Sequence, residues 1–578
     1  MKNLLKYLRP CAKESILSPS FKLLEVIFDL LVPIVIAKMI DLGAVNNDKG
    51  YIVRCFALLV AMAATGLCCT VLAQFFAAKA SVGFSARLRQ AVFDHIQGLS
   101  FTELDSLGTD TIINRLTDDV NQVQNGVNMT LRLLIRSPLI VFGSMIMAFT
   151  VNIKCALVFA VTIPVLFVVI YLIMIISIPL FTRVQEGLDK VTALTRENLT
   201  GVRVIRAFCR EKDSADEFER SNRELTALNE FVGRVSAMLN PLTYVLINLA
   251  AVFLINSCGV QINLGKMQQG EAVALYNYML QMIVELIKLA ALIITINKAL
   301  ACAKRVSAVL DVKTSMEYPA ESVKLPEHTD CAVSFKNVTF TYNGAGSPSL
   351  YNISFDAKKG QTIGIIGGTG SGKTTLVSLI ARFYDATGGK ILIDGASIKS
   401  YTQKALCDKI GIVQQKSLFF RGSVRDNLKM GNENAADDEL WDALATAQAK
   451  EVIEAKPGGL DYQLEQNAAN LSGGQKQRLS IARTLVKKPE ILILDDSSSA
   501  LDFATDAALR SALKRLDGDI VTFIISQRIS GIRHADLILV LDNGRLCAKG
   551  THDELIKLSE TYREIYYSQF PEEKPAKN

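Results

Sequence analysis

Long apolar stretches fill the first half of the chain, whereas the second half holds only short ones. Three stretches lack any charged residue and are long enough to cross a bilayer, because about 20 apolar residues suffice; they are residues 55–78, 155–181 and 235–264. Three less tidy segments have similar length, at residues 16–43, 131–151 and 272–299. The pattern predicts a membrane domain of about six helical spans.

The segments that join the predicted spans alternate in length and in charge. Two connections are long, polar and helical in pattern; residues 79–136 hold six Lys or Arg, and residues 183–234 hold ten. Basic residues favour the cytosolic side of a membrane, so we expect the long connections and both termini to face the cytosol. A turn that ends a long helical pair either contacts another domain or is an ordinary solvated loop. We expect contacting turns near residues 108–119 and 207–213.

Charged side chains inside the predicted spans have two interpretations. Glu25 and Asp29 share a helix face, and Lys22 lies one turn earlier. Charges in a membrane are costly and usually face a cavity or a partner. They form a cation-binding wall of a transport pathway, or a structural ion pair with Lys22, or they lie low enough in the membrane to reach cytosolic water. Glu285 and Lys288 leave the same choice open.

Composition excludes several other classes of protein. The 578 residues are 50% hydrophobic and carry a net charge of +6, without the basic face or tail of a nucleic-acid binder. The 11 cysteines and 4 histidines form neither a metal-ligand cluster nor a disulfide framework, so we expect reduced or membrane-buried thiols. Residues 1–13 predict a short basic helix on the membrane surface rather than a cleaved signal peptide.

The second half alternates strand-like and helical patterns, as α/β domains do. A polar stretch with prolines at residues 314–329 separates it from the membrane half. A buried-strand pattern at residues 362–366 precedes Gly-Gly-Thr-Gly-Ser-Gly-Lys-Thr-Thr at residues 367–375 and an apolar helix. This is G-x-x-x-x-G-K-S/T in its strand–loop–helix context. Its glycines let N–H groups approach phosphate oxygens, and the helix N-terminus attracts negative charge.

The loop and a later acidic residue predict ligands for ATP and Mg²⁺. Lys373 is expected to contact the β- and γ-phosphates, and the Thr374 hydroxyl to contact Mg²⁺. Asp495 follows the apolar strand at residues 491–494 and can hold Mg²⁺ where that strand ends. The remaining expected ATP ligands of the loop are Gly367, Gly370, Ser371, Gly372 and Thr375.

A second anion-binding helix start lies between these two elements. The sequence Leu-Ser-Gly-Gly-Gln-Lys-Gln-Arg at residues 471–478 places a serine and two glycines before a helix. One domain already has its phosphate loop, so Ser472, Gly473, Gly474 and Gln475 are most simply explained as covering a nucleotide held by another domain. Two such domains, packed head to tail, would enclose two ATP molecules.

These motifs resemble the ABC transporter superfamily, specifically the exporter type with six spans followed by one nucleotide-binding domain. The resemblance covers nearly the whole chain. It implies an all-α six-helix membrane domain with long cytoplasmic extensions, fused to an α/β P-loop ABC ATPase domain. The expected boundaries are a transmembrane domain at 1–310, a linker at 311–332, a nucleotide-binding domain at 333–568 and a tail at 569–578.

The resemblance also assigns roles to residues outside the phosphate loop. Residues 197–208 resemble the stretch that leads to the second coupling helix. Tyr342 matches the aromatic residue that stacks on adenine, and Gln415 matches the glutamine that senses Mg²⁺ and links to the membrane domain. Residues 499–502, including Asp502, match the loop that runs along the dimer interface.

Three positions depart from the family pattern. Asp496 stands where the catalytic glutamate is expected, Gln527 stands where the switch histidine is expected, and Gln-Asn-Ala at residues 466–468 replaces Glu-x-Gly. Aspartate is one methylene shorter and withdraws its carboxylate by about 1–1.5 Å; a misplacement of about 1 Å can reduce a rate by roughly 10²-fold. The alternative is that a small backbone shift lets Asp496 reach the water. We therefore expect a weakly hydrolytic site.

The intact signature beside a weakened base predicts a heterodimer. A second ABC half-transporter would supply a competent glutamate and histidine, and Ser472 and Gly474 would complete its site. By resemblance, the chain is one half of a bacterial multidrug-type exporter in the plasma or inner membrane, and its substrates are hydrophobic or amphipathic small molecules. A peptide or lipid exporter and an ATP-gated channel or sensor are the alternatives. The spans disfavour a soluble DNA-repair or translation ATPase, and the fused architecture disfavours an importer.

Overall fold

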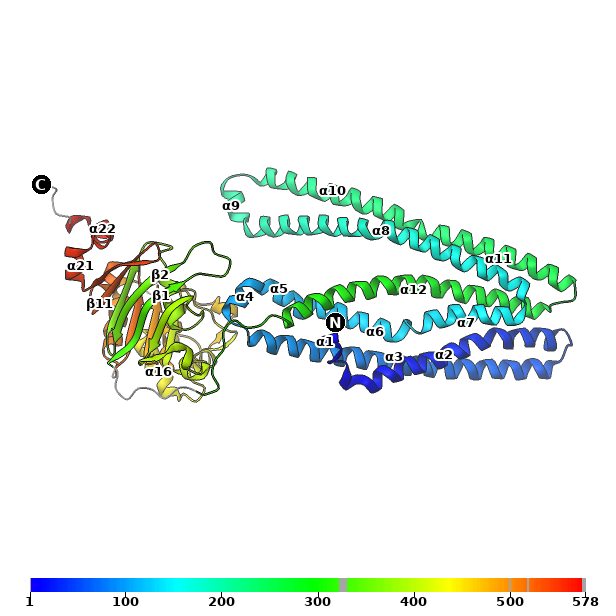
Figure 1. Cartoon of the computed structure of the whole chain (residues 1–578), viewed down its shortest axis with the longest axis horizontal. Helices are drawn as coiled ribbons and strands as arrows, with labels where there is room; N and C mark the ends of the chain where they lie inside the picture. Colours follow the sequence, from blue (N-terminus) through cyan, green and yellow to red (C-terminus); the bar gives the residue numbers. More distant parts are fainter. Residues whose placement is uncertain (1, 322–329, 498–500, 517–518, 574–578) are drawn as a thin grey trace. The chain divides into compact units, whose positions relative to one another are not determined.

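The computed structural model of the chain describes residues 2–321, 330–497, 501–516 and 519–573. It divides into two compact units, each with a core of its own (Figure 1). The helical unit comprises Met1–Gln97 and Asp110–Val312, and the α/β unit comprises Gly98–Thr109 and Lys313–Asn578. The short segment Gly98–Thr109 thus belongs with the α/β unit although long helices flank it in sequence.

The helical unit consists almost entirely of long helices. Its elements are α1 (Lys2–Leu5), α2 (Ala12–Lys38), α3 (Lys49–Gln97), α5 (Thr109–Asn114), α6 (Val120–Leu133), α7 (Arg136–Val151), α8 (Ile153–Thr200), α9 (Val202–Ala207), α10 (Glu211–Ala237), α11 (Leu239–Asn263) and α12 (Gln269–Leu310). A side-chain cap begins the longest of the helices that follow α7. The Asn152 side chain accepts hydrogen bonds from the N–H groups of Lys154 and Cys155 and thereby starts α8.

Among the described residues, five helical stretches are long and apolar enough to cross a membrane: Lys49–Gln97, Thr109–Val151, Ile153–Thr200, Glu211–Asn263 and Gln269–Leu310. They correspond to the second through sixth predicted spans and extend well past them. The first predicted span is the helix α2, which is not among the five and carries Lys22, Glu25 and Asp29 within its length. The count by length and apolarity is therefore five rather than about six.

The core of the helical unit forms around α12. Leu275, Tyr278, Met279 and Met282 of this helix are completely buried. The Tyr278 hydroxyl donates a 2.6 Å hydrogen bond to the Leu30 carbonyl of α2, which satisfies the one polar atom of that side chain. Large apolar side chains elsewhere on α3, α8 and α11 are more than half exposed, including Phe56, Phe75, Val161, Phe167 and Phe253. Such a surface suits lipid rather than water.

A charged network joins α2, α7 and α12, and its members are Lys22, Glu25, Asp29, Arg136, Glu285 and Lys288. Arg136 contacts all three carboxylates, and Lys22 and Lys288 each pair with one of them. Lys22, Glu25 and Glu285 are at most 5% exposed. Pairing within the protein is thus observed for the charges in the predicted spans. A role in binding a transported cation stays a prediction.

The α/β unit contains two main sheets. The six-stranded sheet has the order β12-β11-β3-β10-β9-β6, in which all neighbours are parallel except β12. Its strands are β3 (Thr362–Gly367), β6 (Ile410–Val413), β9 (Ile491–Asp495), β10 (Val521–Ile525), β11 (Leu537–Asp542) and β12 (Arg545–Gly550). An antiparallel sheet, in the order β2-β1-β4-β5, consists of β1 (Cys331–Phe340), β2 (Leu350–Lys358), β4 (Gly388–Ile393) and β5 (Ala396–Ser397). β7 (Gly422–Ser423) pairs with β8 (Gln463–Leu464).

Helices surround these sheets, and apolar side chains fill the space between them. The helices are α4 (Phe101–Leu107), α13 (Lys373–Ile380), α14 (Gln403–Lys409), α15 (Val424–Lys429), α16 (Asp437–Thr446), α17 (Lys450–Glu454), α18 (Gly473–Val486), α19 (Phe503–Lys514), α20 (Ile529–Ile532), α21 (His552–Leu558) and α22 (Glu560–Gln569). Phe335, Phe355 and Phe523 belong to the core shared by both sheets. A second core lies around α15, α16 and α18.

Candidate nucleotide-binding site

Three neighbouring parallel strands bring the predicted nucleotide residues to one edge of the sheet. β3 ends at the glycine loop, β9 ends at Asp495, and β10, which lies between them, ends just before Gln527. Parallel strands place their carboxyl ends on the same edge, where ligands of α/β sheets bind. A cavity of about 660 Å³ opens there, and the predicted residues that line it are Gly370, Ser371, Gly372, Lys373, Thr374, Thr375, Gln415, Asp495, Asp496 and Gln527.

The glycine loop has a backbone that other residues would not tolerate. Gly370 and Gly372 have φ of +80° and +95°, in the left-handed region. A Cβ on Gly372 would also lie 2.7 Å from Leu350 and 2.9 Å from the Ser349 carbonyl. The Ser371 Oγ is buried and has no hydrogen-bond partner among the described residues. A tight loop at a helix start with an unsatisfied hydroxyl fits the phosphates of a nucleotide.

Lys373 and Asp495 lie close enough to each other at this loop for their charges to interact. The Lys373 ammonium donates to the Gly367 and Gly368 carbonyls at 2.8 and 2.6 Å. The Thr374 hydroxyl donates to Asp495 at 3.3 Å, so the two predicted Mg²⁺ ligands face each other. Burial lowers the pKa of Lys373, which the negative charges of Asp496 and Asp495 partly oppose. Burial likewise raises the pKa of Asp495. Both pKa shifts have the same cause, because burial disfavours the charged form of each side chain.

Asp496 has an unusual backbone at the position of the expected catalytic glutamate. Its φ is +47°, and its N–H donates a 3.1 Å hydrogen bond to the Ile525 carbonyl at the end of β10. The Gln415 amide reaches its carboxylate at 3.5 Å, which is the outer limit of a hydrogen bond. Burial raises the pKa of Asp496, and the positive charges of Lys373 and Arg528 oppose that rise. The pocket thus brings a short acid, an amide and a lysine together.

Tyr342 is connected to the loop through α13. Its hydroxyl lies 3.1 Å from the Thr375 Oγ1, and its ring packs edge-on against Phe340 and Tyr384 at centroid distances of 4.7 and 5.3 Å. These contacts hold the ring beside the first turn of α13. The tyrosine predicted to stack on adenine therefore lies at the phosphate-loop end of the unit.

The signature residues lie elsewhere. Ser472 caps α18: its hydroxyl accepts from the Gln475 N–H at 3.3 Å, and the Gln475 side chain accepts from the Ser472 N–H at 3.1 Å. Ser472 and Gly473 are exposed. The described residues that line the cavity at the glycine loop do not include Ser472, Gly473, Gly474, Gln475 or Asp502. Asp502 caps α19 through a 2.8 Å hydrogen bond from the Thr505 N–H, and the rest of the predicted interface loop, residues 499–500, lies outside the described residues.

The turn between the first long helical pair differs from the prediction. The short helix is α4, after Ser100 and before Gly108, whose φ is +73°. Residues 109–119 instead belong to the following helical run. The short helix thus precedes the predicted turn, because Gly108 ends α4. Contact of residues 108–119 with another domain stays a prediction. The second turn likewise begins earlier, with α9 at Val202–Ala207.

Contacts of α4 identify functional candidates that the sequence analysis missed. Phe101 packs on Phe383 at a centroid distance of 4.6 Å, and Asp105 accepts a 2.6 Å hydrogen bond from the Tyr384 hydroxyl. Burial and this hydrogen bond to Asp105 raise the pKa of Tyr384. Tyr384 also contacts Tyr342. Within the α/β unit, contacts therefore run from α4 through Tyr384 to Tyr342, and residue type alone gave no signal for them.

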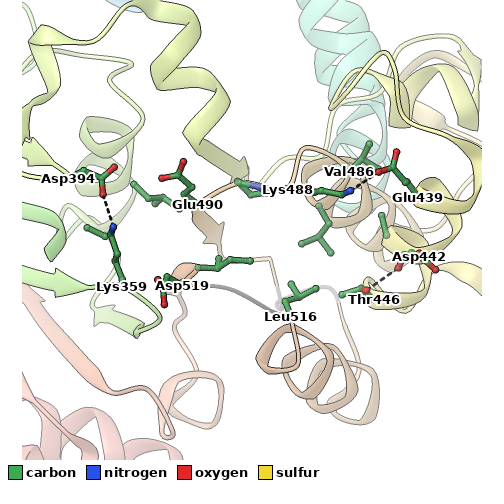
Figure 2. Close-up of a pocket in the computed structure, with 16 residues that line it drawn as sticks. Lys359, Asp394, Glu439, Asp442, Thr446, Val486, Lys488, Glu490, Leu516 and Asp519 are labelled. Atoms are coloured by element: carbon green, nitrogen blue, oxygen red, sulfur yellow. Dashed lines mark hydrogen bonds and ion pairs between the residues drawn. The ribbon is translucent and has the colours of Figure 1, made fainter. Parts of the chain in front are cut away.

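A second cavity, of about 580 Å³, lies between the strands and α16 and α18 (Figure 2). Lys359 pairs with Asp394 at 4.0 Å on one wall, and Lys488 pairs with Glu439 at 2.6 Å on the other. It shares no described lining residue with the nucleotide cavity. Both of its lysines are thus ion-paired, whereas the glycine loop holds a buried hydroxyl without a hydrogen-bond partner among the described residues.

Fold and site together define a membrane protein with a fused P-loop nucleotide-binding unit. The model of the ABC transporter transmembrane region matches residues 15–286, and the model of the ABC transporter nucleotide domain matches residues 350–499. An uncharacterized ABC transporter ATP-binding protein of Mycobacterium tuberculosis (strain CDC 1551 / Oshkosh) is 35% identical over 568 residues, which are 98% of this chain and 97% of that protein. The chain belongs to the ABC transporter family and is a multi-pass membrane protein.

Two further comparisons bear on the kind of transporter. An ATP-dependent lipid A-core flippase of Syntrophus aciditrophicus (strain SB) is 31% identical over 489 residues, 85% of this chain and 81% of that protein. A solved structure of a bacterial Atm1-family ABC exporter with ATP bound has a TM-score of 0.82, covers 99% of each chain and is 24% identical. The fold is therefore that of an ABC exporter, with one membrane region and one ATPase domain in the chain. Such half-transporters act as dimers in a membrane.

Proposed function

We propose that the chain is the degenerate-site half of a heterodimeric exporter. One observation carries this: the exposed signature at Ser472 keeps its cap, whereas the chain's own pocket holds Asp496 and Gln527 at the two catalytic positions. ATP held on the glycine loop would be covered by a partner's signature. The Ser472–Gln475 turn would in return cover ATP on the partner. The nucleotide-binding domain and both termini face the cytosol in this proposal, since the long basic connections lie on that side.

The residues of the nucleotide cavity fit ATP and Mg²⁺. Main-chain N–H groups of the loop and the Ser371 hydroxyl would bind phosphate oxygens, and Lys373 would neutralise their charge. Tyr342 would stack on adenine. Thr374, Asp495 and Gln415 would hold Mg²⁺, which supplies charge neutralisation at the phosphates.

Weak hydrolysis follows from the side chains of Asp496 and Gln527. A general base has to lie within hydrogen-bond reach of the attacking water. The shorter aspartate withdraws its carboxylate by about 1–1.5 Å, and a misplacement of about 1 Å can reduce a rate by roughly 10²-fold. Gln527 can donate a hydrogen bond to phosphate but carries no charge, unlike a protonated histidine. This pocket would then bind ATP, close the dimer and release nucleotide slowly.

Transport would couple to ATP through the short helices at the ends of the long helical pairs. α4 belongs to the chain's own α/β unit, where Phe101 and Asp105 contact Phe383 and Tyr384. α9 and the following Phe208 are exposed, Phe208 by 74%. We propose that this second turn contacts the partner. Closure of the nucleotide-binding domains would turn the membrane domain outward, and hydrolysis at the partner's site would reset it.

The cargo in this proposal is a hydrophobic or amphipathic small molecule. The exposed apolar side chains of α3, α8 and α11 are compatible with entry from lipid. Similarity to a lipid A-core flippase makes a lipid the second candidate. ATP-dependent uptake of a fluorescent lipophilic cation into inside-out vesicles, compared with flipping of a labelled lipid, separates the two. A chain that supports neither but still binds ATP would be a sensor or channel, and the export proposal would be abandoned.

A test of the heterodimer uses a tagged and an untagged copy of this chain expressed together with its candidate partner. We expect the tagged copy to retain the partner and not the untagged copy. Co-purification of two copies of this chain as an active ATPase without another ABC protein would contradict the proposal.

A further inference from the structure

The side chain of Gln569, the last residue of α22, hydrogen-bonds to the loop that carries Gln527. The Gln569 Nε2 donates a 2.7 Å hydrogen bond to the Gln527 carbonyl, and the Gln569 Oε1 accepts a 2.8 Å hydrogen bond from the Ile529 N–H. Both lengths are typical of good hydrogen bonds. One amide therefore bridges the loop between β10 and α20 on both sides of Arg528.

Two further contacts hold this loop: hydrogen bonds within the loop itself and the apolar packing of Ile529. The Ser526 Oγ accepts from the Arg528 N–H at 2.9 Å and donates to the Arg528 carbonyl at 3.0 Å. Ile529 is buried and belongs to the same apolar cluster as Tyr562 and Tyr566 of α22. The apolar cluster places α22 against α20, and the polar end of that contact is Gln569. Among the described residues, its Nε2 is the donor that satisfies the Gln527 carbonyl.

The chemistry of this contact requires a primary amide. A primary amide presents a donor and an acceptor at the same end, whereas glutamate presents only acceptors and leucine presents neither. Fixing the carbonyl of one residue and the N–H two positions later restricts the backbone torsions between them. Holding the Gln527 carbonyl also limits rotation about the bond between its Cα and its carbonyl carbon, and thereby where the Gln527 side chain, which lines the nucleotide cavity, can point.

We propose that Gln569 is a positioning residue for the nucleotide site, acting through Gln527. The proposal rests on the proposed function, in which the Gln527 amide contacts the γ-phosphate of ATP. Gln569 keeps that amide aimed into the cavity, so it favours ATP over ADP without touching either nucleotide. The C-terminal helix thus becomes part of the apparatus that recognises the third phosphate.

The test measures ATP and ADP affinity at this chain separately. The full-length complex in nanodiscs is photolabelled on ice with 8-azido-ATP, which prevents turnover, and the label on this chain is competed with unlabelled ATP or ADP. Gln569→Leu is expected to weaken ATP by roughly threefold to tenfold, the range of one ordinary hydrogen bond, and to leave ADP unchanged. Ser568→Ala is the matched control, because that hydroxyl is exposed and bonds only within its own helix turn, to the Ile565 carbonyl.

Two additional variants identify the contact responsible. Gln569→Glu keeps the acceptor for the Ile529 N–H but loses the donor to Gln527, so it should weaken ATP as much as Gln569→Leu does. Gln527→Ala should lower ATP affinity by a similar factor, and combining it with Gln569→Leu should add little, because both act on one contact.

The outcomes separate this inference from the function on which it rests. If Gln527→Ala leaves the ratio of ATP to ADP affinity unchanged, the proposed role of Gln527 fails. If Gln527→Ala lowers the ratio but Gln569→Leu does not, or lowers both nucleotides equally, the positioning role of Gln569 is overturned. Unchanged ATP affinity of Gln569→Glu, or additive losses of ATP affinity in the double variant, also overturns it.

Discussion

The glycine-loop side and the signature side of the α/β unit contrast in how their functional groups are supported. The glycine loop is surrounded by partly buried charges, and burial shifts the pKa values of Lys373, Asp495 and Asp496. The signature is an exposed helix start closed by reciprocal hydrogen bonds between Ser472 and Gln475. Two of the three departures from the family pattern, Asp496 and Gln527, line the glycine-loop cavity, whereas residues 466–468 precede the signature. The proposal explains this contrast if the signature serves a partner's ATP site and the chain's own site hydrolyses ATP weakly.

The largest expected effect comes from the signature side. Ser472→Ala should reduce ATPase activity of the assembled complex by roughly 10²-fold, because it removes a hydrogen-bond donor from the site where hydrolysis occurs. The rate of steady-state phosphate release by the complex measures this ATPase activity. Ser568→Ala, which alters an exposed serine of α22, is the control. Activity close to that of the unaltered complex would mean that this signature does not complete a hydrolytic site.

Lengthening the acid tests the glycine-loop side. Asp496→Glu should raise hydrolysis at this chain's pocket by roughly tenfold or more, since it returns the carboxylate by about one methylene toward the water. The measurement needs a complex whose partner site has been inactivated, so that the remaining phosphate release comes from this pocket. Asp496→Asn in the same background should show no gain. An unchanged rate with glutamate would locate the defect at Gln527 instead.

A smaller effect is expected when the phosphate loop loses its lysine. Lys373→Ala should lower ATP affinity at this pocket yet reduce total ATPase by less than roughly tenfold, the equivalent of about 1.4 kcal/mol, because the partner's site performs the hydrolysis. Nucleotide photolabelling of this chain and phosphate release are measured on the same sample. In a homodimer, Ser472→Ala and Lys373→Ala would each abolish the ATPase activity. Equal losses would therefore contradict the proposed difference between the signature side and the glycine-loop side.

The smallest effect concerns stability and pH. Burial raises the pKa of Asp495 in the folded protein above that of the unfolded chain, so ionisation destabilises the nucleotide-free fold as pH rises through that folded value. Asp495→Asn should therefore raise the apparent Tm at pH 7.5 by roughly 2–4 °C. The difference should shrink as pH falls toward about 4, the unperturbed value for aspartate. A difference that is constant across this range would contradict the assigned cause.

Much of the nucleotide site was predictable because its chemistry is local in sequence. The buried-strand pattern, the glycines and the apolar helix pattern at residues 362–380 predicted a strand, a turn and a helix. The structure has β3, a turn with glycines at positive φ, and α13 there. The nearness of Asp495 to Thr374 followed from the rule that parallel strands end on one edge. Five of the spans followed from apolar length alone.

Other features depend on contacts between residues far apart in the chain. Arg136 lies more than a hundred residues from Glu25 and Asp29, so the sequence could not decide which charge neutralises them. Gln569 lies at the start of the predicted tail, yet it is the final residue of α22 and reaches Gln527. The position of α4 was missed because its Ser100 and Gly108 stop signals are weaker than the pattern of the long helices around it.

The fate of nucleotide in the two pockets tests the central claim most directly. The complex is incubated with 8-azido-[α-³²P]ATP and vanadate, crosslinked, and separated so that the nucleotide on each chain can be identified. We predict trapped ADP on the partner and intact ATP on this chain. ADP trapped on this chain to the same extent as on the partner would contradict the claim that its own pocket is the weak one.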